Sequence, residues 1–234
     1  VREIEGEMDR KVKLRSGSDV ELVDFMGGDD SVAMSAWISF NNDNEERLQD
    51  RNKVNGLINF LYRNGHHTPF ESSVFTFRVE TPMFVVREVQ RHRSQSMNEW
   101  SGRYSKMLPN FYTPSSERPI VQHGKAGDYS FIEGSPEQYA MVDTAHVEMY
   151  TRAWNLYEEM LDAGIAKEVA RMHLPLATYS QLYITVNARN LIHFLNLRTH
   201  EQALYEIREV ANQMETHLRD KMPYTYAAWK EHHG

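Results

Sequence analysis

Short apolar or alternating runs predict strands in three parts of the chain. Residues 20–26 are mainly apolar and β-branched and end at Gly27 and Gly28, a pair typical of a turn. In residues 73–80, phenylalanine and valine fill one set of alternate positions, and residues 178–186 also alternate. Because alternate side chains of a strand point to opposite faces, we expect these segments to place one face in the core.

Apolar residues spaced three or four positions apart predict helices elsewhere. Residues 45–64 carry such a stripe and are followed by Gly65, a residue suited to the left-handed backbone that ends many helices. Pro82 is expected to open a shorter helix that runs into Arg91, since proline is favoured in a first helical turn. Residues 187–197 also have helical spacing.

Two further helices are predicted to begin with a capping box, in which a hydroxyl residue and a glutamine three positions later satisfy each other's backbone N–H groups. Residues 135–138 fit this pattern and precede a long helix that reaches Gly164. Residues 199–202 fit it again, and their helix is expected to reach about Met222. The apolar face predicted for the first helix consists of Val142, Ala145, Met149, Ala153, Leu156 and Met160.

Residues 108–136 contain three glycines and several prolines among polar residues, which predicts an irregular excursion or lid. Elsewhere, strands and long helices alternate without a regular βαβ rhythm. This arrangement favours an α+β fold with a mixed sheet. We find no internal repeat and no interdomain linker, so residues 1–234 are expected to form a single elaborated domain.

The composition is that of an ordinary soluble globular protein, with 41% apolar and 25% charged residues. No apolar run approaches the roughly 20 residues that span a bilayer, and residues 1–15 lack the apolar stretch of a secretory signal. A net charge of -7 argues against a protein that wraps nucleic acid. We therefore expect a cytoplasmic protein that binds neither membrane nor nucleic acid.

The sequence contains no cysteine, which excludes disulfides, thiolate metal ligands and thiolate nucleophiles. It also lacks both common glycine-rich phosphate loops, Gly-x-Gly-x-x-Gly and Gly-x-x-x-x-Gly-Lys-Ser/Thr. Any nucleotide must therefore be held in another way.

Residues 91–104, here termed the cationic segment, suggest such a way. Arg91, Arg93 and Arg103 present planar forks of N–H donors that match phosphate or carboxylate groups. Ser101 lies among them, but an arginine-rich neighbourhood favours anion binding over a role as nucleophile. The alternative is a solvated surface strand whose arginines form weak salt bridges.

Three more arginines, Arg171, Arg189 and Arg198, lie in apolar stretches and are expected to be buried. A buried arginine needs a partner, because an unpaired buried charge is very costly. That partner is either an internal carboxylate or an external anion. Together with the cationic segment, these arginines exceed what internal pairing usually requires, so we favour an external anion. The side-chain amides of Asn187 and Asn190 could form hydrogen bonds with a flat heterocycle.

His66, His67 and Glu71 could suggest a metal site. However, adjacent histidines on an extended chain point in opposite directions, and no His-x-x-x-His helix supports them. We therefore predict no metal, and expect these side chains either to contact a polar ligand or to belong to a purely structural loop.

Several motifs resemble those of one family. Arg91-His92-Arg93, followed after seven residues by Ser101, is similar to the signature of the flavin-dependent thymidylate synthases. Other segments resemble that family's further motifs in the same order over about residues 20–225: Gly65-His66, Thr68-Pro69-Phe70-Glu71, residues 168–171 with 174–176, and residues 187–189 with 194–198. The resemblance implies a homotetramer of α+β subunits with pockets shared between chains.

The resemblance also implies site residues. FAD is expected to contact Ser39, His66, Thr68, Glu71, Arg91, His92, Arg93, Glu99, Asn187, Arg189 and His193. The substrate dUMP is expected to contact Glu88, Arg91, Glu99, Ser101, Gly102, Arg103, Arg171 and Arg198. Glu88 stands where many members have glutamine, Met97 where tyrosine is frequent, and His193 where asparagine also occurs.

The implied reaction is the reductive methylation of dUMP to dTMP by a methyltransferase. One route to an electron-rich C5 of uracil adds a cysteine thiolate at C6, which this chain cannot supply. By resemblance, reduced FAD carries a hydride, 5,10-methylenetetrahydrofolate supplies the carbon, and NADPH restores the flavin. Arg198 is the expected catalytic residue, since its guanidinium could stabilise negative charge on the pyrimidine.

Three alternatives come from other classes of protein. A nucleotide sensor would bind dUMP through the same arginines without turnover. A metal-dependent hydrolase would use His66, His67 and Glu71, and an RNA-binding module would use residues 91–103.

Overall fold

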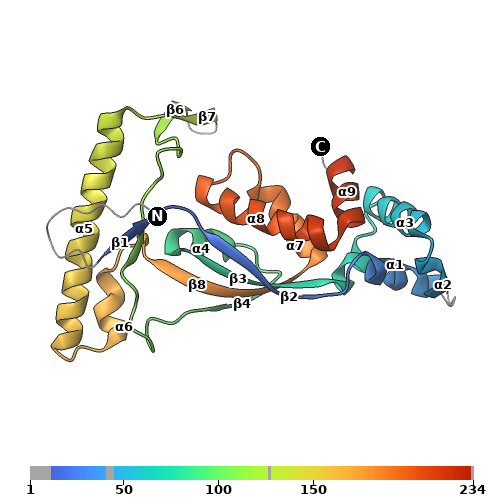
Figure 1. The fold of residues 1–234 in the computed structure, drawn as a ribbon, viewed down its shortest axis with the longest axis horizontal. Helices are drawn as coiled ribbons and strands as arrows, with labels where there is room; N and C mark the ends of the chain where they lie inside the picture. The colour runs from blue at the N-terminus through green and yellow to red at the C-terminus, as the bar shows by residue number, and fades with distance from the viewer. Residues whose placement is uncertain (1–11, 41–44, 126–127, 233–234) are drawn as a thin grey trace. The chain divides into compact units, whose positions relative to one another are not determined.

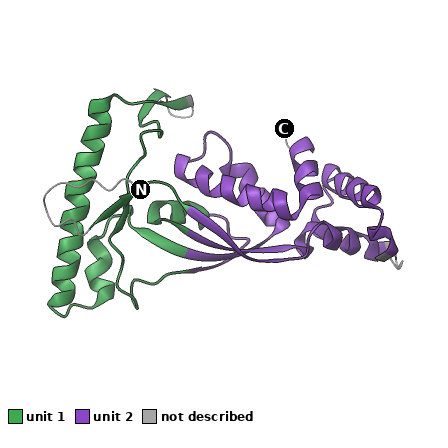
Figure 2. Ribbon diagram, in the orientation of Figure 1, with its two compact units in different colours: residues 1–18, 80–89, 99–181 green, residues 19–79, 90–98, 182–234 purple. Residues whose placement is uncertain are grey.

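The computed structural model describes residues 12–40, 45–125 and 128–232 of the chain (Figure 1). Contacts between residues divide the chain into two compact units, each assembled from separate segments (Figure 2). Unit 1 comprises residues 1–18, 80–89 and 99–181, and unit 2 comprises residues 19–79, 90–98 and 182–234. The single domain expected from the sequence stays a prediction. The presence of both helices and strands confirms the expected mixed α and β content of the fold.

The main sheet has the strand order β2-β3-β8-β4. Its strands are β2 (Asp19–Met26), β3 (Val74–Pro82), β8 (Tyr179–Asn187) and β4 (Ser96–Glu99). The three strands predicted from the sequence are therefore confirmed, and the fourth lies within the cationic segment. The alternation in β3 also holds, because Phe75, Phe77 and Val79 are fully buried. This buried face anchors the strand in the core of unit 2.

Unit 2 contains several helices in addition to its part of the sheet. They are α1 (Asp29–Trp37), η1 (Ile38–Phe40), α2 (Glu45–Leu48), α3 (Arg51–Arg63), η2 (Thr68–Ser72), α7 (Ala188–Arg198), α8 (Tyr205–Lys221) and α9 (Pro223–His232). Helix α8 packs against α7 and β2, and α9 packs against α3. Helix α7 follows β8 without an intervening loop, so residues of the strand and the helix keep a fixed relation.

Two helix predictions in unit 2 need correction. The single helix expected over residues 45–64 is divided into α2 and α3, because Asp50 leaves the helical conformation and its side chain caps α3 by accepting from the Lys53 N–H. Gly65 has a positive φ of 71°, as expected after a helix end. The capping box over residues 199–202 is also wrong: the Thr199 hydroxyl donates to the Leu195 carbonyl at the end of α7. Helix α8 therefore begins only at Tyr205.

Unit 1 contains short strands, one long helix and several short ones. These are β1 (Lys13–Arg15), α4 (Met83–Val89), β5 (Asn110–Tyr112), β6 (Val121–Lys125), β7 (Asp128–Ile132), α5 (Pro136–Asp162), α6 (Lys167–Ala170) and η3 (Arg171–His173). Strands β1 and β5 pair in parallel. Pro82 is the last residue of β3 and does not open a helix, so α4 starts one residue later and ends before Arg91.

Helix α5 confirms its predicted capping box, but its predicted apolar face only in part: Ala153 is buried and Met160 packs against the core. The Ser135 hydroxyl accepts from the Gln138 N–H, and the Gln138 side chain accepts from the Ser135 N–H at 2.8 Å. The buried residues are Tyr150, Ala153, Trp154 and Tyr157, whereas Met149 is 61% exposed. The large rings, with Phe111 stacked on Tyr150, take the core position that the sequence pattern assigned to smaller apolar residues.

The prediction of an irregular segment over residues 108–136 is wrong where β6 and β7 pair. These strands form an antiparallel ladder from Val121 opposite Ile132 to Lys125 opposite Asp128. Backbone pairing satisfies the polar groups of this segment despite its glycines. A role as a lid stays a prediction. Among the described residues, no helix combines the length and apolar character needed to cross a bilayer.

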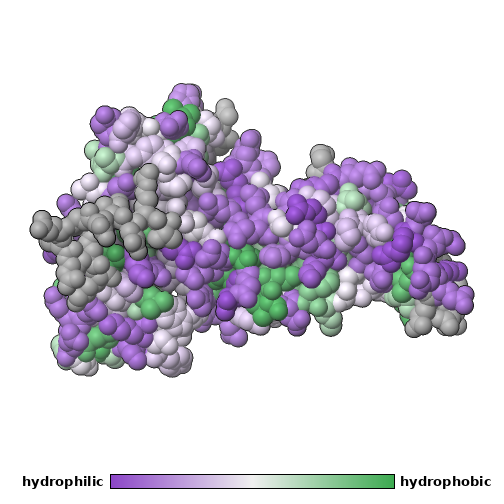
Figure 3. All heavy atoms as spheres, viewed as in Figure 1, coloured by the Kyte–Doolittle hydropathy of each residue, from purple (hydrophilic) through white to green (hydrophobic). Residues whose placement is uncertain are grey.

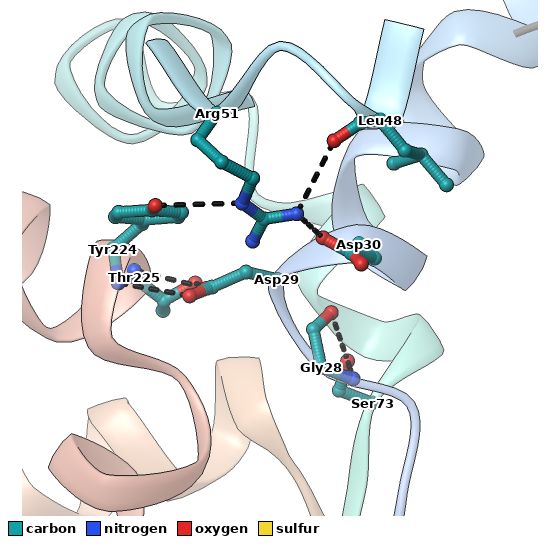
Figure 4. A network of polar contacts seen from close by, with 8 residues as sticks. All are labelled: Gly28, Asp29, Asp30, Leu48, Arg51, Ser73, Tyr224 and Thr225. Carbon is teal, nitrogen blue, oxygen red and sulfur yellow. Dashed lines mark hydrogen bonds and ion pairs between the residues drawn. The ribbon is translucent and has the colours of Figure 1, made fainter. Parts of the chain in front are cut away.

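A buried carboxylate joins the start of α1 to the start of α9 (Figure 4). Asp29 is 5% exposed and accepts hydrogen bonds from the Tyr224 N–H at 2.8 Å and from the N–H and hydroxyl of Thr225 at 3.1 and 2.7 Å. The neighbouring Asp30 forms an ion pair with Arg51 at 2.7 Å, and the Arg51 guanidinium lies over the Tyr224 ring. These contacts hold α9 in place.

Asp29→Asn should change how stability depends on pH. Burial raises the pKa of Asp29 above its ordinary value, although the hydrogen bonds from Thr225 and Tyr224 act in the opposite direction. A raised folded-state pKa means that the folded protein holds this proton more tightly, so Asp29 contributes most below its ordinary pKa and loses that contribution as pH rises through the raised value. The free energy of unfolding of the parent, relative to Asp29→Asn, should fall from acid to neutral pH in urea titrations. A difference that grows with pH would contradict this.

Candidate functional site

A cationic cavity of about 260 Å³ lies in unit 2, between the segment that precedes β4 and helix α7. It is lined by Arg91, His92, Arg93, Ser94, Gln95, Val186, Asn190, His193, Phe194, Leu197 and Arg198. Three arginines on one small cavity suit a ligand with concentrated negative charge, because their planar forks match phosphate oxygens.

A direct contact fixes part of this cavity. The Arg198 Nε donates to the His92 Nε2 at 2.9 Å, and Arg198 lies in the last turn of α7. The His92 ring also meets the Phe194 ring edge to face, with centroids 4.7 Å apart. Arg198 and His92 are both half-buried, so the contact is partly shielded from water.

A second cavity of about 290 Å³, the aromatic cavity, adjoins the first. Asn190 and His193 line both cavities, which places them on the border. The remaining lining residues are Tyr62, His67, Phe70, Arg189, Ile192 and Asn196. The Tyr62 ring stacks on His67 at 5.0 Å, and burial raises the pKa of Tyr62, so its hydroxyl keeps its proton at neutral pH. These rings suit a flat heterocycle.

The junction between β8 and α7 explains why both cavities share one wall. The Asn187 side chain accepts from the Asn190 N–H at 2.9 Å and caps α7, while the Ala188 N–H donates to the Ser73 carbonyl of the segment before β3 at 2.8 Å. The first residues of α7 are therefore fixed by backbone contacts. Successive turns of the helix then present Asn190 and His193, and finally Arg198.

The expectation of buried arginines is wrong. Arg189 is exposed and forms an ion pair with Glu71 at 2.5 Å, so here the internal carboxylate that we considered as an alternative is the partner. Arg171 and Arg198 are half-buried. The apolar residues around them are only partly in the core: Ala170 and Leu195 are buried, whereas Met172 and Leu197, next to Arg171 and Arg198, are exposed. The long arginine side chains can therefore reach towards solvent from the same surface.

The candidate flavin residues of unit 2 fall into two groups. Arg91, His92, Arg93, Arg189 and His193 line one or both cavities. The other group, Ser39, His66, Thr68, Glu71 and Asn187, lines neither of these two cavities.

Sequence reasoning missed three aromatic lining residues, Tyr62, His67 and Phe70. The sequence pattern suggests His67 as a metal ligand or a polar contact, but not as a stacking partner. A usable signal was that Tyr62 and Phe70 flank the two adjacent histidines, which puts several rings within one short segment.

Most of the candidate dUMP residues belong to unit 1. They are Glu88, Glu99, Ser101, Gly102, Arg103 and Arg171, whereas Arg91 and Arg198 belong to unit 2. Glu88 lies near the end of α4, and Glu99 ends β4 and accepts from the Ser180 hydroxyl at 2.8 Å. The sequence-based assignments are thus divided between two parts of the fold.

A tight turn after β4 brings several of these residues together. The Ser101 carbonyl accepts from the N–H groups of Tyr104 and Ser105, and the Ser101 hydroxyl accepts from the Arg103 N–H at 3.3 Å. Gly102 is buried, and a Cβ there would lie 2.6 Å from the Met107 sulfur and 3.1 Å from Cδ of Arg171. A larger residue would have to displace Met107 or Arg171, so Gly102 and Arg171 are close neighbours.

Helix α6 supports the same turn through two polar contacts. The Arg103 Nε donates to Glu168 at 2.9 Å, and the Lys167 ammonium donates to the Tyr104 carbonyl at 3.0 Å. The Arg103–Glu168 pair is exposed, so it is expected to add little to stability. Arg103 can therefore leave Glu168 at small cost.

The described residues contain no group of three or more His, Cys, Asp or Glu side chains that could hold a metal ion. In particular, Glu71 is engaged by Arg189, and His67 is stacked on Tyr62.

Comparison with known proteins identifies related sequences. A family model described as "Thymidylate synthase complementing protein" matches residues 21–224. A flavin-dependent thymidylate synthase from Streptomyces coelicolor is 44% identical over 231 residues, which cover 94% of both chains. A protein of the same name from Thermotoga neapolitana is 42% identical and covers 90% of this chain and 89% of its own.

Solved structures include a similar protein as well. The crystal structure of a UMP/dUMP methylase, PolB from Streptomyces cacaoi, bound with 5-Br UMP, has a TM-score of 0.88 and 40% sequence identity. The similarity covers 95% of this chain and 97% of that one. A second structure of PolB holds 5-Br dUMP.

Proposed function

Because this chain belongs to the family of flavin-dependent thymidylate synthases, we propose that it converts dUMP to dTMP with FAD, 5,10-methylenetetrahydrofolate and NADPH. The observation that carries the proposal is the pair of adjoining cavities in unit 2, one cationic and one aromatic. The absence of cysteine agrees with it, because the chain needs a source of electrons other than thiolate addition.

The residues of unit 2 fit FAD. A diphosphate carries its charge on oxygens that Arg91 and Arg93 can bind with paired N–H donors. A flat ring can lie against Tyr62, His67 or Phe70, where stacking and exclusion of water favour it. When bound and reduced, the flavin supplies a hydride, and NADPH restores it.

The turn in unit 1 fits a nucleoside monophosphate. Arg103 and Arg171 can neutralise the phosphate, and Ser101 can donate a hydrogen bond to it. Gly102 permits backbone to approach a ligand closely. Glu88 and Glu99 can accept hydrogen bonds from hydroxyl or ring N–H groups of the nucleotide.

Arg198 is proposed as the catalytic residue. Its guanidinium retains its charge at all physiological pH values and can stabilise the negative charge that develops on the pyrimidine carbonyls. The half-buried position of Arg198 strengthens this effect, because charges interact more strongly where water is partly excluded.

We further propose a homotetramer with shared sites. Unit 1 exposes many apolar side chains. Soluble monomeric proteins rarely expose large contiguous apolar patches. Figure 3 shows apolar side chains gathered in several places on one face of the protein. Exposed examples from unit 1 are Met141 (73%), Met149 (61%), Val169 (48%), Met172 (77%) and Leu176 (54%). Light scattering after gel filtration would measure the oligomer's mass.

The function is tested by an absorption spectrum followed by an assay. Purified protein is mixed with FAD, desalted, and examined for flavin bands that bleach when NADPH is added without oxygen. Chromatography with mass detection then measures dTMP made from dUMP. A protein that retains no flavin and makes no dTMP would refute the proposal. UMP is assayed in parallel, because the similar PolB protein is named a methylase of both nucleotides.

Ser101→Ala should raise the KM for dUMP by about 3- to 10-fold and leave turnover measurable, because a neutral hydrogen bond contributes roughly 0.5–1.5 kcal/mol. Steady-state kinetics would provide both constants. Complete inactivity with normal dUMP binding would instead support a nucleophilic Ser101.

Gly102→Ala should lower kcat/KM for dUMP by about 10-fold or more, since small displacements of positioning groups have large effects on the rate. The new methyl group would displace Met107 or Arg171, which lie 2.6 and 3.1 Å from its position. The matched control is Gly56→Ala, where no heavy atom lies within 4 Å of an added Cβ. Equal kinetics for both variants would contradict the prediction.

A further inference from the structure

The hydrogen bond between Arg198 and His92 determines the protonation state of the histidine. A guanidinium keeps all its protons in proteins, so the Arg198 Nε is the donor across the 2.9 Å contact. The His92 Nε2 must then present a lone pair. Because a neutral imidazole carries one proton, that proton lies on Nδ1.

Residues of α7 hold the His92 ring in this orientation. His92 meets Phe194 edge to face at 4.7 Å and lies near His193, with centroids 6.3 Å apart. Three residues of α7 therefore surround one ring, two by packing and Arg198 by hydrogen bonding. The segment that carries His92 therefore packs against the last turns of α7.

Three arginines line the cavity that contains this histidine. Arg91 and Arg93 flank His92 along the chain, and Arg198 lies across from it in the cationic cavity. An imidazolium would place N–H against N–H and positive charge against positive charge. The arrangement therefore works only with a neutral His92, and it fixes one edge of the guanidinium plane.

We propose that His92 is a positioning residue for the reaction, which as a neutral hydrogen-bond acceptor orients the Arg198 guanidinium. This role rests on the proposed function of Arg198 and is distinct from the flavin contact that the family resemblance implies for His92. A guanidinium held through its Nε has its donor fork aimed before the substrate arrives, which avoids the loss of rate that misplacement brings.

Two substitutions separate hydrogen bonding from packing. His92→Gln keeps an acceptor oxygen at similar reach, whereas His92→Phe keeps a ring against Phe194 but has no acceptor. With FAD saturating, we expect His92→Phe to lower kcat by about 10- to 100-fold with the KM for dUMP little changed, and His92→Gln to recover most of the loss. His200→Gln, in the turn after α7, is the matched control.

A double variant tests whether His92 acts through Arg198. If it does, His92→Phe combined with Arg198→Ala should be no slower than Arg198→Ala alone. The proposal would be overturned if His92→Phe had the kcat of the parent, or if His92→Gln and His92→Phe lost equal activity. Additive losses of kcat in the double variant would overturn it as well.

Nuclear magnetic resonance of the parent protein provides a readout that does not depend on turnover or on the folding of His92→Phe. Long-range ¹H–¹⁵N spectra of the imidazole rings should show His92 in the neutral Nδ1–H form. The His92 signals are assigned as those that disappear from the spectrum of His92→Gln. A proton on Nε2 in a protein that makes dTMP would overturn only the positioning role. A parent protein that makes no dTMP would overturn both this role and the proposed function.

Discussion

Replacing Arg198 with alanine should reduce dTMP formation by about 10²- to 10³-fold or more, the loss typical when one group that stabilises developing charge is removed. Flavin retention and the oligomer should survive, because Arg198 lies at the end of α7 and its side chain is only half-buried. The measurement is kcat for dTMP production together with the FAD content after gel filtration.

Arg198→Lys refines this result. Lysine keeps the positive charge but loses the planar fork and the Nε donor to His92. We expect its activity to lie between that of the parent and that of Arg198→Ala. The matched control is Arg219→Ala, which removes an exposed arginine whose partner is the adjacent Asp220. Near-parental turnover in Arg198→Ala would refute the assignment of Arg198 as catalytic residue.

Arg93→Ala should weaken FAD binding by about 10- to 100-fold, because a hydrogen bond to a charged group contributes roughly 1.5–3 kcal/mol. Arg93 lines the cationic cavity, where its fork is proposed to meet the diphosphate. Titration with FAD, followed through the quenching of flavin fluorescence, would measure the dissociation constant.

Salt provides an internal check on the Arg93 result. Exposed charges are screened more strongly as ionic strength rises, so the gap between the parent and Arg93→Ala should narrow in concentrated salt. Arg219→Ala again serves as the control and should bind FAD like the parent. An unchanged dissociation constant for Arg93→Ala would show that the diphosphate lies elsewhere.

The regular elements of the fold could be predicted where local chemistry determines the backbone. The capping box of α5 involves residues three positions apart, and the alternation in β3 reflects burial of one face, so both were readable from the sequence. The capping pattern over residues 199–202 failed because the Thr199 hydroxyl had a competing acceptor in α7.

The buried face of α5 shows a different limit. Its rings pack against Phe111, which lies 39 positions before Tyr150 in the chain, and no local pattern reveals that partner. Periodicity alone cannot choose between adjacent stripes when both contain apolar residues. The hairpin of β6 and β7 was missed for a related reason, since its glycines and flanking prolines suggested irregular backbone.

The candidate site also contains residues that could be predicted from the sequence and residues that could not. The arginines and His92 were found because they lie within motifs, and several of them line the cationic cavity. The aromatic cavity was missed because it combines Tyr62 and Phe70 with Asn196, which lies more than 100 positions away. Such a cavity exists only after folding, and its residues carry no shared local signature.

The direct passage from β8 into α7 has a consequence for how this family can change in length. A one-residue insertion in β8 would move each following strand side chain to the opposite face and turn α7 by about 100° about its axis. Arg198 and His193 would then leave the cavity wall together. Insertions and deletions among descendants of this protein should therefore avoid the junction at Asn187 and accumulate in connections such as residues 199–204.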